Sequence, residues 1–334
     1  MRGRADVGRQ WQLSSIVDRL SSTLAAPLSY AMVPLLNGLG RRRMLDGGAE
    51  QHEARLDGVS INYYAQQSVG GPGSDMPILL IHGIADSALT WSFVFGALSR
   101  SHSVYAIDLP GYGYSGLPAG RSYATLDEMR DLLMLFLRDV IGRPALVVGN
   151  SMGGWLAVKL GWAAPDLLRG VILINAGGAP LSGLDSWLPF AETIDICDMR
   201  KARQVFRQMF GAIPAPLLYL GQHSLQETFQ RRVVREFVAD MRGLVPEEVL
   251  LRPGDLRDLP VPAALIWGLG DRFLPEGSLE FFQANMPGAP TLLLKRCGHL
   301  PQRERPFSVV RFIKQFAAQL SMLARPRLKP FQED

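Results

Sequence analysis

Cysteine is scarce in this chain, and no long uninterrupted hydrophobic run is present. Cys197 and Cys297 are the only cysteines among 334 residues, a density far below that of small secreted domains held together by disulfides. We therefore expect a reducing, cytoplasmic setting. Asp18, Arg19 and Pro27 interrupt the leucine-rich N-terminus, and no small-residue cleavage site follows a compact apolar region. This pattern predicts neither a transmembrane helix nor a signal peptide.

The N-terminal extension, residues 1–50, has an amphipathic pattern. Apolar residues recur at helical spacing from Leu13 to Leu24, and the basic run Arg41–Arg43 comes later in the extension. One interpretation is a helix that covers the core. The other is an element that lies on a membrane surface, with the three arginines near anionic headgroups. Peripheral membrane contact through this segment is therefore one of two open hypotheses.

Motifs for nucleic acids, nucleotides and metals are also lacking. Lys and Arg number 35 against 31 Asp and Glu, and most of the basic residues are scattered, so we expect no nucleic-acid partner. Residues 111–116 match the letters G-x-G-x-x-G after a predicted strand, but Pro110 interrupts the turn and the next helical pattern begins only near Leu126. No H-E-x-x-H motif, P-loop or Cys/His cluster occurs. We predict no nucleotide, no metal and no other cofactor.

The chain does contain a regular alternation of short β-rich runs with amphipathic stretches from about residue 54. This alternation is typical of an α/β fold with a mostly parallel central sheet and helices on both faces. The later apolar runs are expected to be interior strands, buried on both sides. The predicted strands are 54–56, 60–65, 77–81, 104–108, 145–148, 171–175, 263–267 and 291–295, and the predicted helices are 91–99, 126–140, 155–164 and 306–320.

Residues 180–255 interrupt the alternation. They contain helical patterns at 199–210 and 225–241 but no convincing strand, and we interpret them as a helical cap insertion. The predicted division is an N-terminal amphipathic extension (1–50), the first part of the core (51–179), the cap (180–255), the second part of the core (256–323) and a tail (324–334). A minority of the apolar side chains of the cap are expected to line a substrate pocket.

Ser151 is the predicted nucleophile. It lies in the run 149–153, Gly-Asn-Ser-Met-Gly, between the strand 145–148 and the helix 155–164, which is the context that a nucleophile elbow requires. A sharp strand-to-helix turn holds the serine in strained geometry, and bulk at Gly149 or Gly153 would collide with the neighbouring chain. The start of the helix adds positive dipole where a carbonyl oxygen becomes negative.

His299 is the predicted base. A serine hydroxyl is a poor nucleophile at neutral pH and needs a neighbouring base, for which histidine has a suitable pKa. Among five histidines, His299 lies in a loop directly after the last predicted strand. His82 belongs to another motif, and we expect it to be a structural hydrogen-bonding residue.

Asp271 is the predicted acid that orients the base. Chain order Ser, Asp, His places this acid between residues 151 and 299, and Asp271 follows the strand 263–267 directly. Asp255 and Asp258 precede that strand and are expected at its far end. The position after the preceding strand, where the acid is sometimes found, carries Asn175.

The predicted oxyanion hole consists of two backbone N–H groups. One belongs to Met152, the residue after the nucleophile, and the other to the loop that follows the strand 77–81. In that loop Gly83 allows a sharp turn, so Ile84 is the predicted second donor.

Together these motifs resemble the α/β-hydrolase superfamily over roughly residues 54–322. Serine at the elbow, where dehalogenases and epoxide hydrolases carry aspartate, argues against those two branches. The runs 149–154, 271–275 and 297–299 look like those of the meta-cleavage-product hydrolases, which cut carbon–carbon bonds. The loop 84–86, the helical cap and Leu300 look more like the monoacylglycerol-lipase-like branch, whose members hydrolyse carboxylic esters.

The resemblance implies a serine hydrolase that acts on a small-molecule ester with an apolar acyl group through an acyl-enzyme intermediate. Three alternatives remain: a carbon–carbon bond hydrolase with the same triad, a perhydrolase or haloperoxidase-like enzyme, and a catalytically silent binding protein on the same fold. The sequence sets neither the acyl-chain length nor the oligomeric state.

Overall fold

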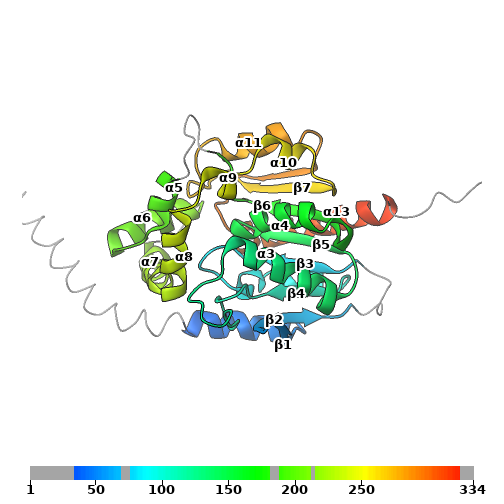
Figure 1. Ribbon diagram of the computed structural model, residues 1–334, viewed down its shortest axis with the longest axis horizontal. Helices are drawn as coiled ribbons and strands as arrows, with labels where there is room; N and C mark the ends of the chain where they lie inside the picture. The colour runs from blue at the N-terminus through cyan, green and yellow to red at the C-terminus, as the bar shows by residue number, and fades with distance from the viewer. Residues whose placement is uncertain (1–33, 69–75, 181–187, 212–214, 324–334) are drawn as a thin grey trace, which may run out of the picture.

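A computed structural model describes residues 34–68, 76–180, 188–211 and 215–323 of the chain (Figure 1). The amphipathic pattern from Leu13 to Leu24 and the tail 324–334 lie outside these residues. No helix in the described part is long and apolar enough to cross a membrane.

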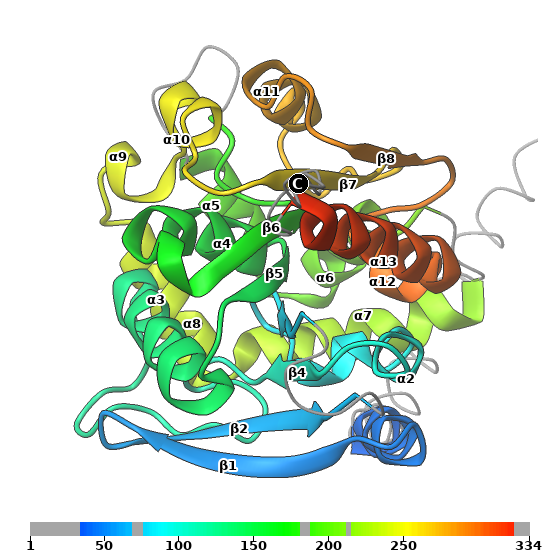
Figure 2. The same ribbon diagram turned by 90° about the vertical axis from the view of Figure 1, so that its right-hand side faces the viewer.

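A single sheet of eight strands forms the centre of the molecule (Figure 2). The strands are β1 (Glu50–Leu56), β2 (Val59–Gln66), β3 (Ile78–Ile81), β4 (Val104–Ile107), β5 (Ala145–Asn150), β6 (Leu168–Ile174), β7 (Ala263–Gly268) and β8 (Thr291–Leu294). Their order is β1-β2-β4-β3-β5-β6-β7-β8. β2 pairs antiparallel with β1 and β4, whereas all other pairs are parallel. The predicted α/β fold with a mostly parallel sheet is confirmed.

Two hydrophobic clusters cover the two faces of the sheet. Leu79 and Ile81 of β3 belong to one cluster, and Ile78 and Leu80 belong to the other, because successive side chains of a strand point to opposite faces. α3 (Leu126–Leu135), the π-helical turn η2 (Phe136–Ile141), α4 (Met152–Ala163) and α11 (Ser278–Asn285) contribute to the first cluster. α2 (Phe95–Leu98) and α13 (Pro306–Leu323) contribute to the second.

The segment between β6 and β7 consists of helices joined by loops in its described part. It contains α5 (Leu188–Ile194), α6 (Met199–Met209), α7 (Ala215–Gln230), α8 (Arg232–Met241), α9 (Pro246–Val249) and α10 (Pro253–Arg257), with no strand among the described residues. Helices α5 to α8 form a group beside the sheet, at the left of Figure 1. We call them the α5–α8 group. The domain boundaries given above remain predictions.

Three sequence predictions need correction. The helix expected at 91–99 is a 3₁₀ turn, η1 (Ala88–Trp91), followed by the single turn α2. The helix expected at 225–241 is interrupted at Arg231, whose ψ of 137° is extended. The strand expected at 291–295 is not buried on both sides, because β8 pairs only with β7 at the edge of the sheet and Leu293 is 42% exposed.

Candidate active site

Ser151 lies in the tight turn between β5 and α4. Its φ of 56° and ψ of −119° are rare for a residue with a side chain. A Cβ atom on Gly149 would lie 2.0 Å from the carbonyl oxygen of Gly153, and one on Gly153 would lie 2.3 Å from the carbonyl oxygen of Ile81. The turn can therefore form only with glycine at both positions, as the sequence suggested.

The loop after β3 closely approaches Ser151. A Cβ atom on Gly83 would lie 2.9 Å from the Cβ atom of Ser151. The next two residues turn sharply, with Ala85 at a φ of 57° and the Asp86 N–H donating to the Gly83 carbonyl at 3.4 Å. Ile84 and Met152 both line a cavity together with Ser151. As the first residue of α4, Met152 has an N–H without an acceptor inside its own helix. The two predicted oxyanion donors thus belong to residues beside the nucleophile.

His82 fixes the orientation of this loop. The ring is fully buried, its Nε2 accepts the N–H of Leu109 at 3.0 Å, and its Nδ1 lies 2.7 Å from the Gly83 carbonyl oxygen. Nδ1 must therefore carry the proton and donate it to Gly83. In a trans peptide the carbonyl of Gly83 and the N–H of Ile84 point in opposite directions. Because His82 holds that carbonyl, it also fixes the direction of the Ile84 N–H.

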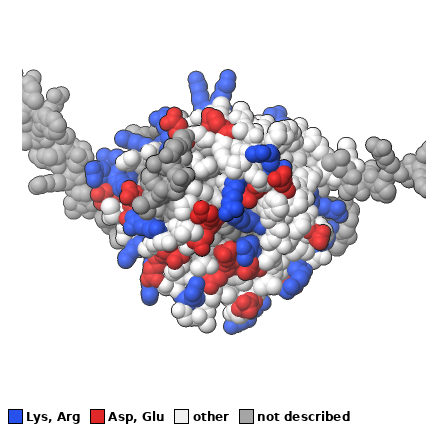
Figure 3. All heavy atoms as spheres, turned by 45° about the horizontal axis from the view of Figure 1, so that its top comes forward, with Lys and Arg blue, Asp and Glu red and all other residues white. Residues whose placement is uncertain are grey.

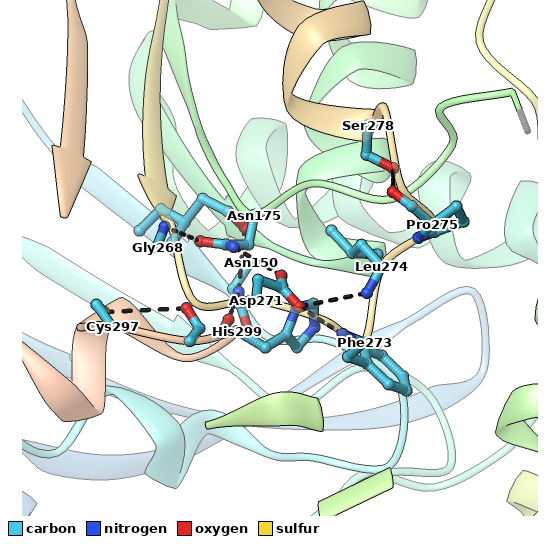
Figure 4. A network of polar contacts seen from close by, with 12 residues as sticks. Asn150, Asn175, Gly268, Asp271, Phe273, Leu274, Pro275, Ser278, Cys297 and His299 are labelled. Atoms are coloured by element: carbon cyan, nitrogen blue, oxygen red, sulfur yellow. Dashed lines mark hydrogen bonds and ion pairs between the residues drawn. The ribbon is translucent and has the colours of Figure 1, made fainter. Parts of the chain in front are cut away.

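Asp271 and His299 form a buried hydrogen-bonded pair (Figure 4). The Oδ2 of Asp271 lies 2.8 Å from the Nδ1 of His299, and both side chains are nearly inaccessible to solvent. The Oδ1 of Asp271 accepts the N–H groups of Phe273 at 2.8 Å and Leu274 at 3.3 Å. Burial alone would raise the pKa of Asp271, but the charge and hydrogen bond of His299, the Phe273 N–H and the Asn175 amide together lower that pKa below its usual value. The geometry therefore favours the ionised carboxylate that a base-orienting acid needs.

Asn175 is a contributor to the site whose contacts sequence reasoning did not identify. It follows β6 with a φ of 39° and is fully buried. Its Nδ2 donates to the Oδ2 of Asp271 at 2.7 Å, and its Oδ1 accepts the N–H of Gly268 at 3.0 Å. One side chain thus holds both the carboxylate and the end of β7 that presents it. The signal in the sequence was its position, since it occupies the strand end where the acid is sometimes found.

His299 is held by contacts on several sides. Its N–H donates to the carbonyl of Met209 at 2.5 Å, and its own carbonyl accepts the Nδ2 of Asn150 at 3.1 Å. The Phe273 ring packs edge to face against the imidazole, with ring centroids 4.7 Å apart. With Nδ1 bound to Asp271, the remaining ring nitrogen is Nε2. His299 and Ser151 line the same hollow.

The two aspartates set aside as alternatives to Asp271 lie away from this pair. Asp255 is in α10 and Asp258 ends it, so both precede β7 and lie at the opposite end of that strand from Asp271. Cys297, two residues before His299, is fully buried. Burial raises the pKa of its thiol to about 12, so this sulfur is a poor nucleophile.

Two hollows meet at Ser151 and Ile84. The first encloses about 710 Å³, including some space open to solvent, and its walls are almost entirely apolar. The second is wider, about 1730 Å³, and polar and apolar groups line it, among them Asn37, Asp86, Arg231 and Arg303. The apolar walls of the first hollow come from α4, from the loop after β6 and from helices between β6 and β7, and include Trp155, Ala179, Phe237, Met241 and Val249.

Known proteins resemble this chain in sequence and in fold. A 2-hydroxymuconate semialdehyde hydrolase from Pseudomonas putida is 28% identical over 261 residues, which are 75% of this chain and 90% of that protein. The crystal structure of a membrane phospholipase A superposes with a TM-score of 0.72 at 22% identity, covering 94% of this chain and 99% of the other. A meta-cleavage product hydrolase from Pseudomonas fluorescens IP01 gives a TM-score of 0.66 at 21% identity, covering 80% and 97%.

At these identities the solved structures show a common fold. The family itself is shown by a model of the Alpha/beta hydrolase family, which matches residues 78–312. That range includes the Ser151 turn, the loop of Ile84, and the Asp271–His299 pair. The chain belongs to the Alpha/beta hydrolase family.

Proposed function

We propose that the protein is a serine hydrolase of carboxylic esters with apolar acyl groups. One observation carries the proposal: Ser151 lies where two hollows meet. Its strained turn lines the apolar hollow, and His299, bonded to Asp271, lines the second hollow. A nucleophile, a base with a fixed orientation and an apolar pocket for the acyl group are the parts that this acyl transfer needs.

In the proposed mechanism, the Oγ of Ser151 attacks the ester carbonyl while the Nε2 of His299 takes its proton. The negative charge that develops on the carbonyl oxygen is stabilised by the N–H groups of Met152 and Ile84. His299 then protonates the departing alcohol, which leaves an acyl group on Ser151. Water, activated by the same histidine, releases the acid and restores the serine. Asp271 keeps the proton on Nδ1 of His299 and stabilises the imidazolium.

The two hollows suggest how an ester would lie. A hydrocarbon chain gains free energy by leaving water for the apolar hollow, roughly 25 cal/mol for each Å² of apolar surface buried. An alcohol with hydroxyl or charged groups suits the wider second hollow, where polar side chains are available. We therefore place the acyl group beside Trp155 and Phe237, and the leaving alcohol on the side of His299.

The direct test is hydrolysis of p-nitrophenyl esters of graded chain length. Ser151→Ala should abolish turnover. Ser308→Ala should leave turnover unchanged, because Ser308 lies in α13, which covers the face of the sheet opposite to α4. Labelling by a fluorophosphonate probe should show the same difference. Equal turnover by Ser151→Ala and the wild-type protein would refute the proposal, and a fully folded wild-type protein that fails to label would favour the binding-protein alternative.

Carbon–carbon bond hydrolysis is the second candidate. The similarity to the 2-hydroxymuconate semialdehyde hydrolase over 75% of the chain favours it, and the same Ser151, His299 and Asp271 would serve. Loss of the yellow dienolate colour of a meta-cleavage product, faster than hydrolysis of any ester in the series, would favour this activity over ester hydrolysis.

A further inference from the structure

A stripe of three arginines on α6 lines an open hollow. Arg200, Arg203 and Arg207 of α6 are spaced three and four residues apart and therefore share one face of the helix. Arg272, in the loop that follows β7, lines the same hollow. The described residues that line this hollow are Arg200, Arg203, Gln204, Arg207, Gln208 and Arg272. It contains about 650 Å³ of space and is open to solvent.

The charges of this stripe are poorly compensated. Arg203, Arg207 and Arg272 form no ion pair within the described part of the chain, although Arg203 donates its Nε to the neutral Gln222 at 2.8 Å. Arg200 comes within 3.9 Å of Asp198, whose other oxygen already accepts the Lys201 N–H at the start of α6. On the face seen in Figure 3, basic and acidic side chains are interspersed.

Local electrostatics do not explain this arrangement. Cations three or four residues apart on a helix repel each other, and Arg200 lies in the first turn of α6, where the helix dipole is unfavourable to a cation. Guanidinium groups are always charged, and each presents several N–H donors in a planar fork. Four of them around one hollow would be stabilised by an anion with several oxygens.

We infer that the hollow between α6 and Arg272 is a binding site for a phosphate group. A carboxylate has one charge and two oxygens and satisfies a single guanidinium fork, whereas a phosphate carries up to two charges and accepts from several forks at once. The phosphate belongs either to a small soluble anion or to a lipid headgroup. The recognising chemistry is the same in both cases.

The hollow lies where α6 meets the loop that carries Asp271, so phosphate binding there would affect how the two pack. α6 is part of the α5–α8 group, while Arg272 belongs to the loop that carries Asp271. The carbonyl of Gln208, in the wall of the hollow, accepts the Arg272 N–H at 2.9 Å, and the next carbonyl, that of Met209, accepts the N–H of His299. A phosphate bound by Arg207 and Arg272 would add a further contact across this junction and hold α6 against the loops of Asp271 and His299.

The experiment compares Arg207→Gln/Arg272→Gln with a control of equal charge, Arg235→Gln/Arg252→Gln. Both control arginines are exposed, and neither lines the hollow. Thermal unfolding is followed while inorganic phosphate replaces chloride at constant ionic strength. The wild-type protein and the control should show a saturable rise in Tm, and the test variant should need at least about tenfold more phosphate for the same rise, since each guanidinium contact with an anion is a charge-assisted hydrogen bond.

Two further measurements complete the test. Hydrogen exchange of residues 271–274 and 296–300 should slow with phosphate in the wild-type protein but not in the test variant. Sedimentation with phosphatidylglycerol vesicles, compared with phosphatidylcholine vesicles, distinguishes the sources. A Tm rise without vesicle preference indicates a soluble phosphate, and a vesicle preference that the test variant loses indicates a headgroup. Identical responses of wild type and test variant in both arms would overturn the site. None of these measurements depends on ester hydrolysis.

Discussion

Replacing Asn175 by alanine tests whether the acid depends on a neighbour from the adjacent strand. The change removes the hydrogen bond to Asp271 at 2.7 Å and leaves the N–H of Gly268 without its 3.0 Å partner. A hydrogen bond to a charged group contributes about 1.5–3 kcal/mol and a neutral one about 1 kcal/mol. Alanine also tolerates the left-handed φ of 39° less well than asparagine. We expect the free energy of unfolding to fall by about 3–5 kcal/mol.

Catalysis should fall as well, because a carboxylate that has lost one of its donors no longer holds the imidazole in a single orientation. A small misplacement of a catalytic group can lower the rate on the order of 100-fold, so kcat for a p-nitrophenyl ester should fall by about 10- to 100-fold with little change in KM. Asn285→Ala is the matched control. Asn285 is also buried and its Nδ2 donates to Phe281 at 2.8 Å, but it lies in α11, outside the site. If both variants lose stability and neither loses kcat, Asn175 has no positioning role.

The remaining predictions concern Asp271, the apolar hollow and the N-terminal helix. The lowered pKa of Asp271 gives stability that is present above the unfolded-state pKa of about 4 and is lost as pH falls through the folded-state pKa, so urea unfolding of Asp271→Asn should show a shallower loss of stability below pH 4 than wild type does. Ala179→Leu fills part of the apolar hollow and should raise KM for long acyl esters while p-nitrophenyl acetate is hydrolysed as before; uniform effects on all chain lengths would place the acyl group elsewhere. The described helical stretch 34–46 contains Leu35 and Leu39, which are 54% and 56% exposed. We propose that this face contacts membranes, so Leu35→Glu/Leu39→Glu should weaken sedimentation with anionic vesicles; unchanged sedimentation would indicate a purely structural helix.

Local sequence patterns were sufficient to predict the fold and to select the candidate site residues. Glycine is required at 149 and 153 because a Cβ atom there would lie only 2.0 and 2.3 Å from backbone carbonyl oxygens, so the turn of Ser151 could be predicted from its own pentapeptide. The break between α7 and α8 could not be predicted from the sequence. Arg231 has an extended ψ of 137°, but it is neither glycine nor proline, the residues that usually mark such a break. The exposure of β8 was missed for a related reason: an apolar run does not reveal whether its strand ends the sheet.

The partners of the Asp271–His299 pair follow from the order of the sheet. Along β5-β6-β7-β8 the neighbours in space are also successive in the chain, and β3 lies beside β5 although β4 comes between them in the sequence. Parallel strands present their carboxyl ends at one edge. The residue after β6 therefore lies beside the residue after β7, which explains why Asn175 reaches Asp271, and the loop after β3 lies beside the Ser151 turn after β5. The contact of Met209 could not be inferred in this way. Its carbonyl accepts the His299 N–H from the end of α6, and the strand order says nothing about where α6 lies. Contacts made along the sheet could thus be inferred from strand order, whereas the contact from α6 depends on how a separate group of helices packs.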